Sequence, residues 1–176
     1  MSGAKGQGGH APSYYAATAN DTRERPRLED SITADVAIVG AGFTGISAGL
    51  ALAERGLDVV VLEAERIGWG ASGRNGGQIV NGYSRDLEVI ATRYGKDKAA
   101  ALGRMSLEGG DIIRSRVARY GIDCDLRAGN AFVAFHDKQL RYLETSAEDW
   151  RQHGHDGLEL VDKAGLRRVV DSDRYV

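Results

Sequence analysis

The segment of residues 35–63 constrains the fold more than any other part of this sequence. It begins with a short apolar run, residues 35–39, of the kind that forms a strand buried on both faces of a parallel sheet. A helical pattern follows over residues 44–55, and Gly56 is suited to end that helix. A second apolar run, residues 57–62, predicts another buried strand. Strand, helix and strand in this order predict a βαβ unit with parallel strands.

The turn between the first strand and the helix carries the pattern GxGxxG at positions 40, 42 and 45. Gly40 permits the tight turn, Gly42 lets a phosphate approach the backbone, and Gly45 lets the helix pack closely on the sheet. The positive end of the helix then faces the phosphates. Glu63 ends the second strand, where it is placed to accept hydrogen bonds from ribose hydroxyls and to repel the 2′-phosphate of NADP. A tight turn alone would explain neither Gly42 nor Glu63. The pattern therefore predicts a site for the ADP half of a dinucleotide, with contacts from Gly40, Ala41, Gly42, Phe43, Thr44, Gly45 and Glu63.

The GxGxxG pattern with Glu63, called the fingerprint below, does not distinguish FAD from NAD. A second glycine-rich stretch, residues 66–80, favours FAD. It reads RIGWGASGRNGGQIV, with too much glycine for a helix. Such a backbone can run close to a flat ligand with its N–H groups turned toward it. A flexible surface loop is the alternative interpretation. Because the stretch leaves the sheet just after Glu63, it is predicted to lie beside the far half of the dinucleotide. The residues predicted to contact it are Ala64, Arg66, Ala71, Ser72, Gly73, Asn75, Gly76, Gly77 and Gln78.

These motifs resemble those of the FAD-dependent amine and amino-acid oxidoreductases of the D-amino acid oxidase type. Residues 40–49 match their GxGxxGxxxG pattern, Glu63 matches their ribose-binding acid, and residues 70–78 match their GASGRNGGQ stretch. Within that family the sequence is most similar to the bacterial gamma-glutamylputrescine oxidases. Shorter matches extend the resemblance over nearly the whole chain, at residues 13–15, 83–86, 122–125 and 172–175.

The resemblance implies FAD as the cofactor and an amine as the small-molecule substrate. Its C–N bond would be oxidised to an imine, which hydrolyses to an aldehyde, with O2 as the electron acceptor. An amine or amino-acid dehydrogenase with another acceptor and a non-catalytic nucleotide-binding fragment remain alternatives. No catalytic residue is assigned, because the flavin carries the chemistry.

The expected fold class is α/β, a Rossmann-like FAD-binding domain followed by the beginning of an inserted α+β substrate domain. Family members are considerably longer, so the chain is expected to be an N-terminal portion of a larger enzyme. Residues 1–34 are expected to form a flexible tail and lead-in. Residues 35–122 would form the N-terminal part of the FAD-binding domain, and residues 123–176 the start of the substrate domain.

Further elements are predicted downstream of the glycine-rich stretch. Apolar spacing predicts helices over residues 87–94, 102–117, 140–150 and 163–168, and strands over residues 131–135 and 158–161. Ser84 and Asp137 are the predicted N-caps of the first and third of these helices.

Composition excludes several classes of protein. The net charge of −2 comes from interleaved positive and negative residues, which is not typical of a nucleic-acid binder. No apolar run is long enough for a membrane span, and residues 1–20 lack a secretory h-region. The single cysteine, Cys124, excludes an internal disulfide, fits a reducing cytoplasm and is expected to be a small buried hydrophobe. The cluster at residues 153–156 has two histidines and an aspartate but no further ligand, so a solvated helix end is expected and no metal site.

Overall fold

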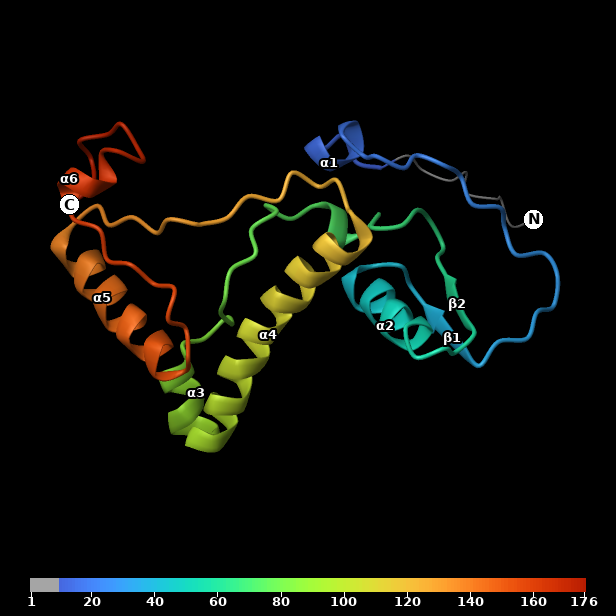
Figure 1. Ribbon diagram of the computed structural model, residues 1–176, viewed down its shortest axis with the longest axis horizontal. Coiled ribbons are helices and arrows are strands. Elements are labelled where there is room, and N and C mark those ends of the chain that lie inside the picture. The colour runs from blue at the N-terminus through green and yellow to red at the C-terminus, as the bar shows by residue number, and fades with distance from the viewer. Residues whose placement is uncertain (1–9) are drawn as a thin grey trace, which may run out of the picture. The chain divides into compact units, whose positions relative to one another are not determined.

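The computed structural model describes residues 10–176, which belong to two compact units, one ending at Gly77 and the other beginning at Gln78. The first unit contains α1 (Tyr14–Ala17), β1 (Val36–Val39), α2 (Phe43–Ala53), β2 (Val59–Leu62) and the 3₁₀ turn η1 (Ala71–Gly73). The second contains α3 (Leu87–Tyr94), α4 (Lys96–Tyr120), α5 (Asp137–Gln152) and α6 (Lys163–Leu166) (Figure 1). The predicted domain boundary at residue 122 stays a prediction.

The predicted βαβ unit is confirmed. β1 and β2 pair in parallel, with Val36 opposite Val59 and Val39 opposite Leu62, and α2 connects them (Figure 1). The helix packs on one face of the strands at Gly49, which is buried. A Cβ at Gly49 would lie 3.2 Å from Val61 Cγ2. The glycine therefore sets the close approach of α2 to the sheet.

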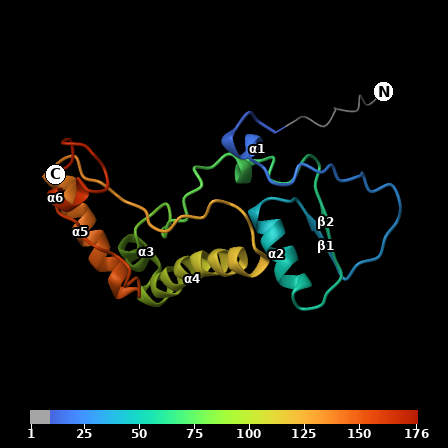
Figure 2. The ribbon, with the colours of Figure 1, turned by 45° about the horizontal axis from the view of Figure 1, so that its top comes forward.

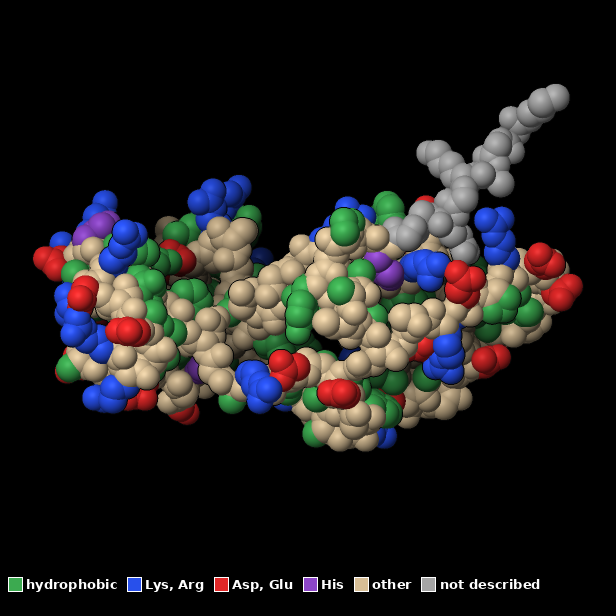
Figure 3. Space-filling model, turned by 90° about the horizontal axis from the view of Figure 1, so that it is seen from above, with side chains coloured by type: hydrophobic (Ala, Val, Ile, Leu, Met, Phe, Trp, Pro, Cys, Tyr) green, Lys and Arg blue, Asp and Glu red, His purple; other side chains and the backbone are tan. Residues whose placement is uncertain are grey.

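The expectation that both strands are buried on both faces is wrong for the part of the chain that the structure describes. Side chains alternate between the two faces of a strand, and α2 covers only one face. Val39, on the other face, is 87% exposed, and Leu62 is also exposed. Large hydrophobic side chains reach the surface elsewhere as well, as the space-filling view shows (Figure 3). One connecting helix thus leaves an apolar face of the sheet uncovered.

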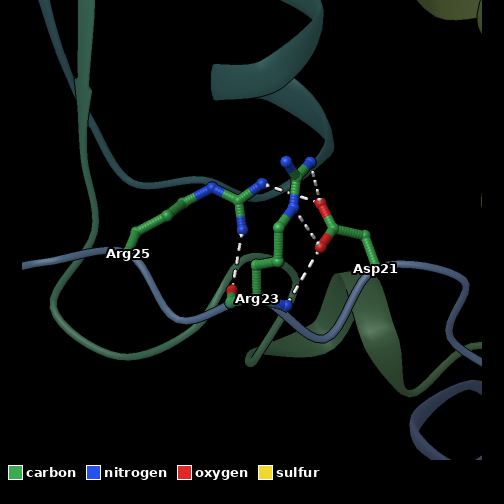
Figure 4. A network of polar contacts seen from close by, with 3 residues as sticks. All are labelled: Asp21, Arg23 and Arg25. Carbon is green, nitrogen blue, oxygen red and sulfur yellow. Dashed lines mark hydrogen bonds and ion pairs between the residues drawn. The ribbon is translucent and has the colours of Figure 1, made fainter.

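The lead-in before β1 contains local structure that the sequence pattern did not indicate. Ser13 caps α1, its hydroxyl accepting from the Ala16 N–H at 3.2 Å. Downstream, the Asp21 carboxylate accepts hydrogen bonds from Arg23 and Arg25 (Figure 4), and its pKa is lowered mainly by the Arg23 side chain. A helix of four residues is too short to show apolar periodicity. Residues 1–9 of the predicted tail lie outside the described residues.

In the second unit, α3 and α4 pack as a pair and bury Leu87 and Ala99 (Figure 2). They join at Gly95, whose φ of +94° suits glycine. The helix predicted over residues 102–117 begins earlier, at Lys96. The prediction missed the first turn because that turn is polar and shows no apolar spacing.

Ser84 does not cap α3, since Asp86 is the N-cap residue. The Asp86 carboxylate accepts a hydrogen bond from the Tyr142 hydroxyl at 3.1 Å instead of capping the helix. Burial and this contact raise the pKa of Tyr142.

The next helix, α5, is capped by His136 and not by Asp137, which is its first residue. The His136 ring accepts a hydrogen bond from the Gln139 N–H at 3.3 Å. His153 is the C-cap residue of α5, so the cluster at residues 153–156 lies at a helix end as expected, but the His153 side chain is less solvated than expected. That side chain is 17% exposed, and a Cβ on Gly103 of α4 would lie 2.9 Å from its Cδ2.

Among the described residues no group of three potential metal ligands is found, and no helix combines the length and apolar character needed to cross a membrane.

Two predicted strands are wrong. Residues 131–135 and 158–161 form no strand. A strand needs a partner for its main-chain groups, whereas within the described part of the chain residues 131–135 have one backbone-to-backbone bond, from the Val176 N–H to the Ala134 carbonyl at 3.0 Å. In residues 158–161, the Leu158 carbonyl accepts a hydrogen bond from a side chain, that of Arg151, at 3.0 Å.

Cys124, expected to be buried, is exposed.

Candidate functional site

The carboxyl ends of β1 and β2 lie side by side, because parallel strands end at the same edge of a sheet. The Gly40 N–H donates to the Leu62 carbonyl at 2.7 Å, which extends the pairing by one residue. Gly40 then turns the chain into α2 with a φ of +99°, a conformation that side chains rarely adopt. This turn brings the GxGxxG loop directly above the end of the sheet.

Two glycines of this loop, Gly42 and Gly45, stand where a side chain would meet close neighbours. A Cβ on Gly45 would collide with the Gly40 carbonyl oxygen and lie 3.3 Å from Ile38 Cγ2. A Cβ on Gly42 would lie 3.0 Å from the Ser72 hydroxyl. Gly42 is the N-cap residue of α2, so the bare backbone is exposed at the positive end of the helix. The loop and the helix therefore form a cradle for an anionic group.

Glu63 reaches from the end of β2 to the same loop. One of its carboxylate oxygens accepts from the Ala41 N–H at 2.7 Å and the other from the Glu65 N–H at 3.0 Å. These N–H bonds, the one from Ala41 first, lower the pKa of Glu63, and the N–H of Ala64 adds a smaller effect in the same direction. The side chain is exposed and ionised, with lone pairs left to accept further hydrogen bonds.

The glycine-rich stretch after β2 returns to the fingerprint. The Gly68 N–H donates to the Ala41 carbonyl at 3.0 Å. The turn η1 follows, and its Ser72 hydroxyl accepts from the Phe43 N–H at 3.0 Å. Ser72 therefore lies at the amino end of α2, beside the cradle for the anionic group. The flanking residues Ala71 and Gly73 belong to the same turn, and a Cβ on Gly73 would collide with the Gly68 carbonyl oxygen.

The Asn75 side chain stabilises the next part of the glycine-rich stretch through two hydrogen bonds. Its side-chain amide donates to the Ser72 carbonyl at 2.7 Å, and its oxygen accepts from the Gly77 N–H at 2.8 Å. Gly76 lines an open cleft beside α1. Gln78 begins the second unit, so its place at the site stays a prediction.

Two interactions hold the beginning of this stretch. Arg66 pairs with Glu24 of the lead-in at 2.8 Å, and the Arg74 guanidinium lies 4.9 Å from the centre of the Trp69 ring. The Trp69 indole N–H is buried without a hydrogen-bond partner among the described residues. Sequence reasoning missed the contact with Glu24, for which the lead-in carries no pattern.

The residues present fit the ADP half of FAD. They offer a helix amino end for the pyrophosphate, glycines that leave it room, and an ionised, exposed carboxylate for the ribose. Of the predicted contacts, the structure brings together the fingerprint, Glu63 and Ser72. The roles of these and the other predicted contacts toward a ligand stay predictions. No catalytic residue is assigned by the geometry.

Comparison with known proteins shows to which family the chain belongs. A family profile described as FAD dependent oxidoreductase matches residues 35–176. The chain is 58% identical to gamma-glutamylputrescine oxidoreductase of Escherichia coli, over 94% of this chain and 39% of that protein. It is 42% identical to the probable oxidoreductase OrdL of Haemophilus influenzae, over 95% of this chain and 39% of that protein. A protein of that name from Rhizobium meliloti is 33% identical, over 93% of this chain and 38% of its own length.

This chain thus spans 38–39% of the length of these curated relatives. No solved structure gives a significant match. The family profile covers most of the sequence, including the βαβ unit and the glycine-rich stretch. The chain therefore belongs to the family of FAD-dependent oxidoreductases, and FAD is its cofactor.

Proposed function

We propose that this chain is the FAD-binding portion of an enzyme that oxidises the C–N bond of an amine such as gamma-glutamylputrescine, with O2 as the electron acceptor. The observation that carries the proposal is the cradle in which the GxGxxG loop, Glu63 and Ser72 meet at the amino end of α2. The 58% identity to gamma-glutamylputrescine oxidoreductase supports the choice of substrate.

Each part of the cradle has a role in holding FAD. The amino end of α2 binds the pyrophosphate, because the first N–H groups of a helix have no acceptor within it. Ser72 already accepts from the Phe43 N–H and lies within hydrogen-bonding range of the same region. Glu63 accepts from the ribose hydroxyls while the Ala41 N–H holds its carboxylate in place. The stretch from Ala71 to Gln78 supports the flavin half.

The bound flavin would supply the redox chemistry by taking a hydride equivalent from the carbon next to the amine nitrogen. The overall reaction then balances as R–CH2–NH2 + O2 + H2O giving R–CHO + NH3 + H2O2. The protein must hold that carbon about 3–3.5 Å from the reacting flavin atom. No described residue of this chain is assigned to that task, and we propose that a substrate domain beginning after residue 122 performs it.

The test uses the natural full-length protein with gamma-glutamylputrescine, putrescine and a D-amino acid as alternative substrates. Oxygen consumption and peroxide formation are followed beside the reduction of an artificial acceptor under argon. Oxidation of gamma-glutamylputrescine with stoichiometric peroxide supports the proposal. Turnover with the artificial acceptor alone would replace O2 by another acceptor, and a flavin-loaded protein that oxidises no amine would refute the enzymatic assignment.

A further inference from the structure

The short helix α1 contacts the glycine-rich stretch through one side chain. Tyr15 lies against Gly77, where an added Cβ would collide with the tyrosine hydroxyl and lie 3.5 Å from Cζ. Gly77 has a φ of +77°. The two residues are 62 positions apart in the sequence but belong to the same compact unit. Figure 2 shows α1 beside the green segment that contains η1.

The same stretch is held from within by Asn75. The Asn75 side chain accepts from the Gly77 N–H and donates to the Ser72 carbonyl, while the Ser72 hydroxyl accepts from the Phe43 N–H. A continuous set of contacts thus runs from Tyr15 through Gly77, Asn75 and Ser72 to the amino end of α2. Tyr15 is the one member of this set that comes from the lead-in.

An open cleft of ≈ 580 Å³ lies between α1 and the stretch. Tyr14 lines it from the α1 side, and Arg74, Asn75 and Gly76 line it from the other. The Tyr14 ring is 70% exposed and meets the Tyr15 ring edge-on at a centroid distance of 6.1 Å. The cleft therefore has an aromatic wall on α1 and a polar wall on the stretch.

We infer that Tyr15 is a positioning residue for FAD, since it holds Gly77 and with it the stretch that supports the flavin half. This inference rests on the proposed function. Tyr15 contacts the stretch directly and reaches the ADP cradle only through Gly77, Asn75 and Ser72, so its loss affects FAD more than ADP. Removing the ring is expected to raise the Kd of FAD about three- to tenfold, because the stretch must then be ordered when FAD binds. The Kd of ADP is expected to change less than that of FAD.

A pair of glycine variants tests the contact itself. Gly77→Ala adds a Cβ that collides with the Tyr15 hydroxyl, and its φ also disfavours alanine. Gly68→Ala is the matched control, because Gly68 has a φ of +70° while a Cβ there would meet no atom within 4 Å. Tyr15→Phe removes only the hydroxyl. It should therefore recover part of the FAD affinity lost in Gly77→Ala and none of that lost in Gly68→Ala.

The measurements are fluorescence titrations of the full-length apoprotein with FAD and with ADP, together with the visible circular dichroism of the bound flavin. Weaker FAD binding and an altered flavin spectrum in Tyr15→Ala, with ADP binding retained, support the inference. Equal Kd values of FAD for wild type and Tyr15→Ala would overturn it, as would failure of Tyr15→Phe to improve Gly77→Ala. If Tyr15→Ala does not fold, the glycine pair still decides. A wild-type protein that binds ADP but no FAD would refute the proposed function instead.

Discussion

Replacing Glu63 by alanine tests the proposed ribose contact most directly. The carboxylate is held by the N–H groups of Ala41 and Glu65 at 2.7 and 3.0 Å, and it keeps lone pairs for ribose hydroxyls. A hydrogen bond to a charged group contributes about 1.5–3 kcal/mol. Because about 1.4 kcal/mol corresponds to a tenfold change in affinity, Glu63→Ala is expected to raise the Kd of FAD about ten- to hundredfold.

Glu63→Gln separates the charge from the shape of the side chain. Glutamine keeps one oxygen that can accept from the Ala41 N–H but loses the acceptor for the Glu65 N–H, because its amide NH2 group only donates. The loss of affinity should therefore be smaller than in Glu63→Ala. The N–H bonds lower the pKa of Glu63 in the folded protein. The contribution of the Glu63 carboxylate to the free energy of unfolding is therefore complete above the pKa that this group has in the unfolded chain. It is lost as the pH falls through the lower pKa that the group has in the folded protein. Wild-type FAD affinity should decrease over that acidic range, whereas Glu63→Gln should show only the protonation of FAD itself.

Fluorescence titration of the full-length apoprotein at neutral and acidic pH measures both effects, and far-ultraviolet circular dichroism verifies that each variant is folded. A folded Glu63→Ala protein with an unchanged Kd of FAD would show that the ribose lies elsewhere. A Glu63→Gln protein with the same pH dependence as wild type would show that the carboxylate is not the titrating group.

Three further predictions concern stability and activity. Gly45→Ala should lower the free energy of unfolding by about 1–3 kcal/mol in urea denaturation, because its Cβ collides with the Gly40 carbonyl; unchanged stability would contradict the described packing of α2. Gly109→Ala should instead raise it by about 0.5–1 kcal/mol, since a Cβ there meets no atom within 4 Å in the middle of α4. Residues 1–176 expressed alone should oxidise no amine, because no described residue is assigned to hold the substrate and apolar side chains such as Val39 are exposed. Peroxide formation by that polypeptide at roughly 1–1000 per second, typical of enzymes, would refute this last prediction.

The βαβ unit was predictable because its signals are local and agree with one another. The two apolar runs, the glycine pattern and Gly56 all lie within 29 residues, and β1, α2 and β2 form where they predict. Glu63 was predictable as a neighbour of the fingerprint, because parallel strands end at one edge of a sheet. Its bond to the Ala41 N–H was not, since a sequence pattern does not show which acceptor satisfies a given amide.

Features set by distant contacts escaped prediction. The strand expected at residues 131–135 has the right composition, but a strand depends on a partner that composition does not identify. Asp86 is the N-cap residue of α3 in place of Ser84, and its carboxylate binds Tyr142, 56 residues away. The contact of Tyr15 with Gly77 left only an indirect signal, the family match at residues 13–15. The choice of a helix cap, as in α3, and contacts between loops depend on tertiary structure more than on local propensity.

The short sequence separations within the cradle have a consequence for synthesis on the ribosome. The bonds from Ala41 to Glu63 and from Phe43 to Ser72 span 22 and 29 residues. Both bonds lie within one continuous segment of the chain, and N-terminal regions emerge first during translation. We therefore expect the ADP cradle to assemble on the nascent chain soon after Ser72 leaves the exit tunnel. Cells depleted of riboflavin should then accumulate protease-sensitive nascent chains, because the cofactor that would stabilise the cradle is scarce when it first forms.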